Sequence, residues 1–399
     1  MFRIASYGQA LLRSLPFDAF TRDIWLICIS NVIGAFGEGL YFWVFPLYIK
    51  SLQADYVQIG LVFSTLYGAS ALTLLLGGLL ADRFDRKKVL ILGWMPWVFA
   101  PLIYSFAANW QQLIPGAVCW GVSMIGVPAA NAYIITSIKD RKKMASALSF
   151  VWSSYSFSYI FAPSVGGYLA TVIDMRWVLR ISALLTAVAT GVFFMLRSQH
   201  PQKKSNPIQD KPQHLDNGKP VWRRMLLWSA YSGFVTFFMS VGKTFVPTFL
   251  AEQVKFSEFY VGLFGSISYA GVTFIGITMG YLGDRWRKSR AISLCLFFFA
   301  VSMVPLFLVR EVPVLMFMAF FFGGSVVTGT LVSSLVGSIA PEDRRGFWLS
   351  VPLTFNLVAS FIAPYLAGYL YTLNLASVFV ISVSATPILI LYALAKLKE

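Results

Sequence analysis

The chain has 399 residues, of which 57% are hydrophobic and only 12% are charged, and its mean hydropathy is +0.70. A composition this apolar excludes an ordinary soluble globular protein and indicates a protein that crosses a membrane several times. The formal net charge of +15 would suit nucleic-acid binding in a soluble protein, so the position of the basic residues decides what it means.

Twelve apolar runs follow one another along the chain, each long enough to cross a hydrocarbon core of ~30 Å at 1.5 Å per residue. The stretch 197–222 between the sixth and seventh runs is polar and is predicted to be a cytoplasmic linker. We therefore expect an all-α membrane protein with twelve transmembrane helices in two pseudo-symmetric six-helix bundles, at 1–196 and 223–399. The predicted helices lie at roughly 24–49, 57–81, 88–108, 111–138, 144–172, 177–196, 223–250, 259–283, 290–309, 312–339, 347–372 and 374–395.

The basic residues are distributed unevenly between the two sides of the predicted membrane segments. With both termini in the cytoplasm, 26 of the 32 Lys and Arg residues lie on that side, five lie on the other and Lys243 lies within a run. This skew follows the positive-inside rule, so the net charge reports topology and contact with anionic lipid, and nucleic acid is not expected as a partner. We expect a multi-pass protein of a bacterial or archaeal inner (cell) membrane.

Two short phrases occur once in each half of the chain. The segment 78–87 (GLLADRFDRK) follows the second run, and 280–288 (GYLGDRWRK) follows the eighth, 202 positions later. The segment 162–169 (APSVGGYL) recurs at 363–370 (APYLAGYL), at an offset of 201. A common register of this kind indicates an internal duplication, as in transporters built from two repeats.

These phrases also carry a family resemblance that covers nearly the whole chain. The segment 78–87 resembles the loop motif between helices 2 and 3 of the major facilitator superfamily, and 162–167 is similar to the Gly-Pro-x-x-Gly-Gly motif in helix 5 of its antiporters. Asp85 stands where the loop motif usually has Gly, Ala162 replaces the Gly before the proline, and Ala117 lies near the place of the family's membrane-embedded Arg. The last difference departs from the usual drug/proton antiport arrangement.

The resemblance implies that segment 78–87 is a latch that closes the cytoplasmic side in the outward-open state. A carboxylate there suits the positive end of a neighbouring helix, basic side chains suit lipid headgroups, and Gly78 and Gly280 suit helices that slide closely past each other. The proline and glycines of helix 5 allow a bend that seals one side. The simpler readings are a solvated basic turn and plain helix packing. The candidate gating residues are Gly78, Asp82, Arg83, Arg86, Asp284, Arg285, Pro163, Gly166 and Gly167.

Two charged residues lie deep within predicted spans, Glu38 in the first and Lys243 in the seventh. Because a charge in hydrocarbon is costly, such residues face a cavity or a partner. The position equivalent to Glu38 in the second half is one turn from Lys243, and the resemblance implies that both helices line a central cavity. Three readings remain open: proton or substrate coupling by Glu38, a static Glu38–Lys243 ion pair, and peripheral snorkelling positions.

Polar and aromatic side chains within the spans are the further candidates for a substrate-binding site. Aromatic residues make up 17% of the chain, which favours a cavity for an apolar or amphipathic solute, although such residues also serve helix packing. Besides Glu38 and Lys243, the candidate binding residues are Asn31, Tyr41, Tyr67, Asn131, Trp152, Tyr155, Tyr269 and Asn356.

The expected function is secondary active transport, with proton-coupled export of a small amphipathic or lipophilic compound by alternating access. Gly242-Lys243-Thr244 lacks the first glycine and the strand of a phosphate-binding loop, so we expect no ATP site, cofactor, metal site or enzyme activity. The alternatives are import or facilitated diffusion of an anionic metabolite and, less favoured, a non-transporting membrane sensor. The expected partners are the substrate, protons and membrane lipids, with the chain a monomer.

Overall fold

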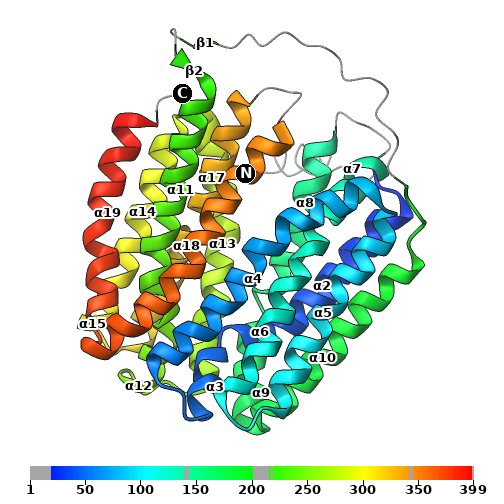
Figure 1. Cartoon of the computed structure of the whole chain (residues 1–399). Helices are drawn as coiled ribbons and strands as arrows, with labels where there is room; N and C mark the ends of the chain where they lie inside the picture. The colour runs from blue at the N-terminus through cyan, green and yellow to red at the C-terminus, as the bar shows by residue number, and fades with distance from the viewer. Residues whose placement is uncertain (1–18, 139–142, 201–214, 217–218, 341–344, 398–399) are drawn as a thin grey trace, which may run out of the picture.

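The computed structural model describes residues 19–138, 143–200, 215–216, 219–340 and 345–397. Its helices form two bundles that stand side by side (Figure 1). The first bundle contains α2 (Arg22–Phe42), α3 (Phe45–Ser51), α4 (Tyr56–Arg83), α5 (Arg86–Phe106), α6 (Leu113–Val122), α7 (Gly126–Ser137), α8 (Met144–Ser158), α9 (Ala162–Val172) and α10 (Met175–Val192). The second contains α11 (Val221–Thr244), α12 (Val246–Glu252), α13 (Glu258–Arg285), α14 (Lys288–Met303), α15 (Pro305–Leu308), α16 (Val312–Phe322), α17 (Gly324–Ile339), α18 (Arg345–Leu373) and α19 (Ser377–Lys396).

These helices make twelve crossings, six in each bundle, and confirm the predicted fold. Within the described residues, 10 helical stretches, some of which join two consecutive helices, are long and apolar enough to span a membrane. The other two crossings, α8 with α9 and α14 with α15, are each interrupted. Pro163 lies in the first turn of α9 and Pro305 begins α15. Proline has no N–H to donate and its ring crowds the carbonyl of the preceding turn, so the helical hydrogen bonding is interrupted near each of these residues.

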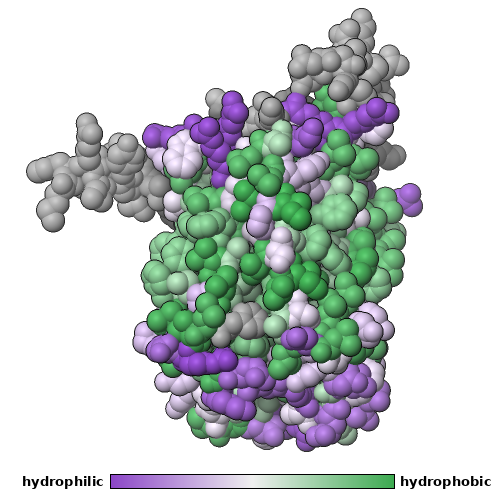
Figure 2. Space-filling view, turned by 90° about the vertical axis from the view of Figure 1, so that its left-hand side faces the viewer, coloured by the Kyte–Doolittle hydropathy of each residue, from purple (hydrophilic) through white to green (hydrophobic). Residues whose placement is uncertain are grey.

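The bundle surface carries an apolar band. In Figure 2 hydrophobic residues cover the middle of the face shown, and hydrophilic residues gather toward its two ends. Large apolar side chains such as Leu72 and Ile388 are 75% and 70% exposed, which suits contact with lipid chains and not with water.

The connection between the bundles differs slightly from the prediction. Helix α11 begins at Val221, two residues before the predicted start of the second bundle at 223. Just before it, Leu215–Asp216 (β1) and Lys219–Pro220 (β2) pair as antiparallel strands. They are the only strands in the parts of the chain that the structure describes, so the fold remains all-α. We call the end of the molecule that carries this connection the linker end.

The two bundles meet at the opposite end, beside α3, α9 and α12 (Figure 1), which we call the closed end. Here α9 packs against α13, and α18 packs against α4. Gly262 of α13 lies against the backbone of Pro163, and Gly60 of α4 lies against that of Pro364. A Cβ at either glycine would overlap the proline carbonyl, so only glycine allows the helices to approach this closely.

A hydrogen bond accompanies each of these contacts. The amide of Ser164 donates to the Ser266 hydroxyl at 2.9 Å, and the amide of Tyr365 donates to the Ser64 hydroxyl at 3.2 Å. The two serines are separated by the same 202 positions as the two latch phrases. The repeat seen in the sequence therefore produces two equivalent contacts between the bundles.

Candidate functional site

A central cavity of about 280 Å³ lies between the bundles. Its walls come from α2, α3 and α4 on one side and from α11, α12, α13, α17 and α18 on the other. The first bundle contributes mainly aromatic side chains, namely Phe42, Trp43, Phe63 and Tyr67, and the second contributes hydroxyl and amide groups together with Tyr269 and Lys243. The lining thus combines a broad apolar surface with a few polar groups, as small-molecule sites do.

Lys243 is the charged residue of this cavity. It lies in the last turn of α11 and forms no hydrogen bond or ion pair with any residue that the structure describes. Across the cavity, the Asn356 amide is bonded to the hydroxyls of Ser232 and Thr236 at 2.9 and 3.0 Å. Asn356 is therefore held in place, whereas the Lys243 ammonium remains available to a solute.

A second cavity, of about 240 Å³, lies inside the first bundle. We call it the side cavity, and it shares no lining residue with the central cavity. Helices α2, α5, α6, α7 and α8 enclose it. Its walls include Glu38, Asn31, Trp94, Trp97, Trp120, Trp152 and Tyr155.

Glu38 is the charged residue of the side cavity and is only 3% exposed. The hydroxyl of Tyr155 donates a hydrogen bond to its Oε2 at 2.9 Å. Tyr155 contacts Tyr159 with ring centroids 5.6 Å apart, and Tyr159 contacts Tyr269 of the central cavity at 4.6 Å. A row of tyrosines thus connects the carboxylate to the space between the bundles.

Of the three readings left open for Glu38 and Lys243, the static ion pair is not formed in this conformation. The two residues line different cavities, and no ion pair joins them within the described part of the chain. The repeat register places both residues at a similar depth in the membrane. However, Glu38 lies on the side of α2 that faces the interior of the first bundle. The ion-pair reading is therefore not supported here.

The remaining candidate binding residues divide between the two cavities and the core. Tyr67, Tyr269 and Asn356 line the central cavity, and Asn31, Trp152 and Tyr155 line the side cavity. Asn131 lines neither, and instead accepts a hydrogen bond from the Trp152 indole at 2.8 Å. Tyr41 is 1% exposed and packs against Phe45 and Tyr104, so its predicted role as a lining residue is wrong.

The latch segment lies open at the linker end. Asp82 and Arg83 are exposed and make no hydrogen bond or ion pair with described residues. A Cβ at Gly78 or Gly280 would meet nothing within 4 Å. The predicted close passage of helices at these glycines is therefore absent in this conformation. Arg285 lies over the Tyr281 ring at 4.5 Å, and the side chain of Asp284 lies outside the described residues.

Arg86 differs from its predicted contact with lipid headgroups. Its guanidinium donates to Thr136 Oγ1 at 3.0 Å and to Gln199 Oε1 at 3.2 Å. Beside it, Asp85 caps α5 and accepts from the amides of Lys87 and Gln199, both at 3.0 Å. Burial by itself raises the pKa of Asp85, but these donors outweigh it and the pKa is lowered from the ordinary 3.8. This cluster joins parts of the first bundle.

The contacts of Pro163, Gly166 and Gly167 fit both interpretations of their motif, namely helix packing and a bend that seals one side. Gly166 lies against the backbone of Leu40 in α2, which is packing within the first bundle. Gly167 lies against Glu258 of α13, which is contact between the bundles. The chain bends just before Pro163, between α8 and α9. The motif thus shapes α9 and contributes to the closed end.

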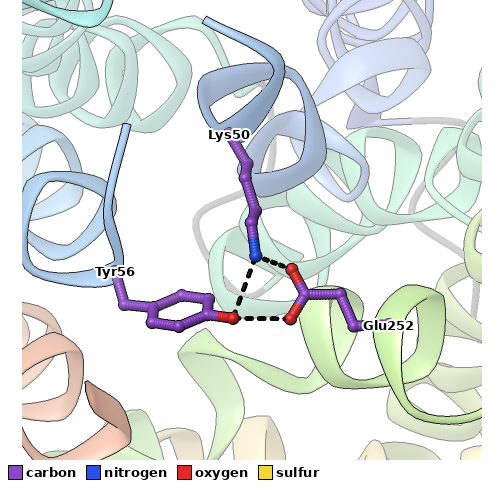
Figure 3. Close-up of polar contacts among 3 residues, drawn as sticks. All are labelled: Lys50, Tyr56 and Glu252. Atoms are coloured by element: carbon purple, nitrogen blue, oxygen red, sulfur yellow. Dashed lines mark hydrogen bonds and ion pairs between the residues drawn. The ribbon is translucent and has the colours of Figure 1, made fainter. Parts of the chain in front are cut away.

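Sequence reasoning missed a polar cluster at the closed end. Lys50 forms an ion pair with Glu252, and Tyr56 donates to the other oxygen of Glu252 at 2.7 Å (Figure 3). The Lys50 ammonium also donates to the Tyr56 hydroxyl at 2.9 Å and lies over its ring at 4.2 Å. Lys50 and Glu252 are 202 positions apart, so the repeat register could have identified them as equivalent positions.

Two membrane-spanning bundles around a shared cavity define a polytopic membrane transporter. The chain belongs to the Major Facilitator Superfamily, whose sequence pattern matches residues 27–257 and 239–399. It is thus an integral, multi-pass transporter of small molecules, and the family assignment speaks for a transporter and against an enzyme.

Similar proteins of known name include drug-resistance proteins. The chain is 26% identical over 382 residues to multidrug resistance protein 2 of Bacillus subtilis (strain 168), covering 89% of this chain and 90% of that protein. It is 21% identical over 360 residues to quinolone resistance protein NorA of Staphylococcus aureus (strain COL), covering 89% and 91%.

Solved structures support the fold. The nucleoside transporter NupG matches with a TM-score of 0.74 at 13% identity, covering 95% of this chain and 100% of that one. A bacterial homologue of the iron transporter ferroportin in an inward-facing state matches with a TM-score of 0.71 at 14% identity, covering 95% and 99%.

Proposed function

We propose that the protein exports small amphipathic or lipophilic compounds from the cytoplasm, in exchange for protons, by alternating access. The observation that carries this proposal is the central cavity, in which an aromatic wall faces a wall of hydroxyl and amide groups. Such a lining suits a solute with both apolar and polar surface. Two relatives are named for multidrug and quinolone resistance, which supports export of drug-like compounds.

The conformation of the two bundles fits one state of such a cycle, the state that is open toward the cytoplasm. The linker end carries most of the basic residues, so by the positive-inside rule it faces the cytoplasm, together with both termini. The bundles are joined at the closed end. At the linker end Asp82 and Arg83 of the latch segment make no hydrogen bond or ion pair with described residues. This arrangement corresponds to a carrier that is open toward the cytoplasm. The cycle then requires the closed-end contacts to separate and the latch to form.

Glu38 is the proposed proton site. It is the carboxylate that lines the side cavity, and Tyr155, Tyr159 and Tyr269 connect it to the central cavity. Protonation would remove a buried charge, and release of the proton would restore it, so the energy of each conformation would depend on the proton.

The test uses inverted membrane vesicles that contain the protein and a fluorescent quinolone. An imposed proton gradient should drive quinolone accumulation in vesicles with the parent protein. Glu38→Gln should abolish this accumulation while exchange of quinolone across the membrane continues, because the cavity is kept and its titratable group is lost. Glu311→Gln is the matched control, since Glu311 is exposed at the start of α16. Gradient-driven accumulation that survives in Glu38→Gln would contradict the proposed coupling.

A second function is favoured by one observation. The ammonium of Lys243 is available in the central cavity, as an anchor for an anionic metabolite would be. In that case Lys243→Ala would abolish binding of carboxylate or phosphate solutes and leave quinolone export intact. Loss of quinolone export without any effect on anions would exclude this alternative.

A further inference from the structure

We propose that the side cavity binds the charged end of an organic cation, with preference for a quaternary ammonium group. The inference rests on the proposed function, since it names the class of compound that Glu38 would hold. It differs from that function in place, because the site lies within one bundle and shares no residue with the central cavity.

The walls of the side cavity are unusually rich in indole rings. Four of the chain's 12 tryptophans line it, at positions 94, 97, 120 and 152, together with Tyr155. Aromatic rings carry partial negative charge on their faces and attract cations, and cages of such rings bind quaternary ammonium groups. Glu38 adds a full negative charge to the same space, so the cavity is complementary to a positive charge.

The hydroxyl and amide side chains of the cavity are already engaged. Ser30 donates to the carbonyl of Ala189 at 2.7 Å, Asn31 to that of Val151 at 3.0 Å, and Ser123 to that of Trp120 at 2.6 Å. A primary ammonium has three hydrogens to satisfy and is strongly hydrated, so it would lose more in this space than it gains. A quaternary ammonium has no such hydrogens, and the aromatic walls suit its methyl groups.

The volume of the side cavity indicates that it holds one end of a ligand. At about 240 Å³ it is, like the central cavity of about 280 Å³, smaller than the pockets of about 300–1,000 Å³ that enclose drug-sized molecules, so a drug-sized ligand would extend beyond it. Trp120 forms the wall between the cavities, since it stacks on Phe42 at 5.8 Å and contacts Tyr67 at 6.3 Å.

The experiment measures binding of choline and of its uncharged isostere 3,3-dimethylbutan-1-ol to the purified protein by titration calorimetry. We expect choline to bind the parent at least about tenfold more tightly than the isostere, the size of a desolvated cation–π contribution. Glu38→Gln and Trp120→Leu should each weaken choline binding by about tenfold or more. The matched controls are Glu311→Gln and Trp177→Leu, because Trp177 is 55% exposed on the outer surface, and both should bind choline like the parent.

Equal binding of choline and the isostere to the parent would overturn the inference without any substitution, so it does not depend on whether a variant folds. Unchanged choline binding in Glu38→Gln would overturn it as well. If choline binding fails while Glu38→Gln still abolishes gradient-driven quinolone transport, the inference is wrong and the proposed function stands. If choline binding depends on Glu38 while vesicle transport does not, the site is supported and the proposed proton coupling is wrong.

Discussion

Individual charges at the closed end hold the two bundles together. The side chains of Lys50 and Glu252 are 36% and 22% exposed, so water screens their attraction, and such pairs contribute about 1 kcal/mol or less. Tyr56 adds a hydrogen bond and a ring contact to the same two groups. For a carrier whose two states differ by a few kcal/mol, a contribution of this size changes the populations noticeably.

We predict that Glu252→Gln increases the population with a separated closed end by up to about fivefold, equivalent to about 1 kcal/mol. Spin labels in the loops 52–55 and 253–257 would report the distance between the bundles. Glu311→Gln removes an exposed carboxylate elsewhere and should leave the distances unchanged. Identical distance distributions in the parent and Glu252→Gln would show that the pair does not stabilise closure.

Asp85 gives a prediction about pH. Its pKa is lowered in the folded protein by hydrogen bonds from two backbone amides, which outweigh burial. Its stabilising contribution is therefore full above the ordinary value of 3.8 and is lost as the pH falls through the lower, folded pKa. Asp85→Asn keeps the shape of the cap and should lower stability at pH 7 by about 1 kcal/mol, the difference between a charged and a neutral acceptor.

Thermal unfolding of both proteins in detergent checks this expectation. The difference in melting temperature between the parent and Asp85→Asn should narrow as the pH is lowered below about 4. Asp82→Asn changes a carboxylate of the same segment that is exposed and has no hydrogen bond or ion pair with a described residue. This variant should melt like the parent at both pH values. If the difference in melting temperature does not change with pH, the negative charge of Asp85 is not the source of its stabilising effect.

At the scale of the helices, α13 makes contrasting contacts along its length. Near its start Gly262 lies against the Pro163 backbone, and near its end Gly280 has open space around it. We predict that Gly262→Leu separates α13 from α9 and disfavours the closed end by about 1–3 kcal/mol, the usual cost of overpacking. Cysteine labelling at the closed end from outside should then become faster.

Gly280→Leu is the matched control within the same helix. Because its side chain has room in this conformation, closed-end labelling should not increase. If both substitutions accelerate labelling equally, the effect comes from a general loosening of α13 and not from the contact with Pro163.

The sequence predicted the helices and the repeat better than it predicted which side chains lie close together. The twelve crossings and the repeat were predictable because long apolar runs and a fixed offset are local properties of the chain. The separation of Glu38 from Lys243 was not, because it depends on how far α2 is rotated within its bundle. Lys50 and Glu252 escaped notice because each, taken alone, looks like a solvated charge at a helix end; only their spatial proximity gives them a role.

At the scale of the whole molecule, the latch and the closed end are alternatives. In the present conformation Asp82 has no hydrogen bond or ion pair with a described residue, and we expect its charge to act in the opposite state. We predict that Asp82→Asn weakens closure of the linker end by about 1–2 kcal/mol, the upper range for a carboxylate at a helix N-terminus. Spin labels at the linker ends of α4 and α18 should shift toward longer distances, and an unchanged distribution would count against the latch.

The conformational state could not be read from the sequence for a physical reason. One chain encodes both the contacts of the closed end and those of the latch, and the two states differ by only a few kcal/mol. Gly78 illustrates this. Its place in a repeated motif predicts a close approach of helices, yet the space around it is empty here. A sequence motif has to supply the contacts of every conformation in the transport cycle, whereas this structure shows only one of those conformations.

The ion pair at the closed end also bears on how the two halves can assemble. Lys50 and Glu252 occupy equivalent positions of the repeat, 202 residues apart. In a symmetric dimer of identical halves, equivalent residues on the two-fold axis meet their own copies. Two lysines or two glutamates would then repel each other at this point. A half expressed alone would therefore meet a like charge here on self-association, while the two different halves, supplied as separate chains, would retain the attraction and so prefer each other.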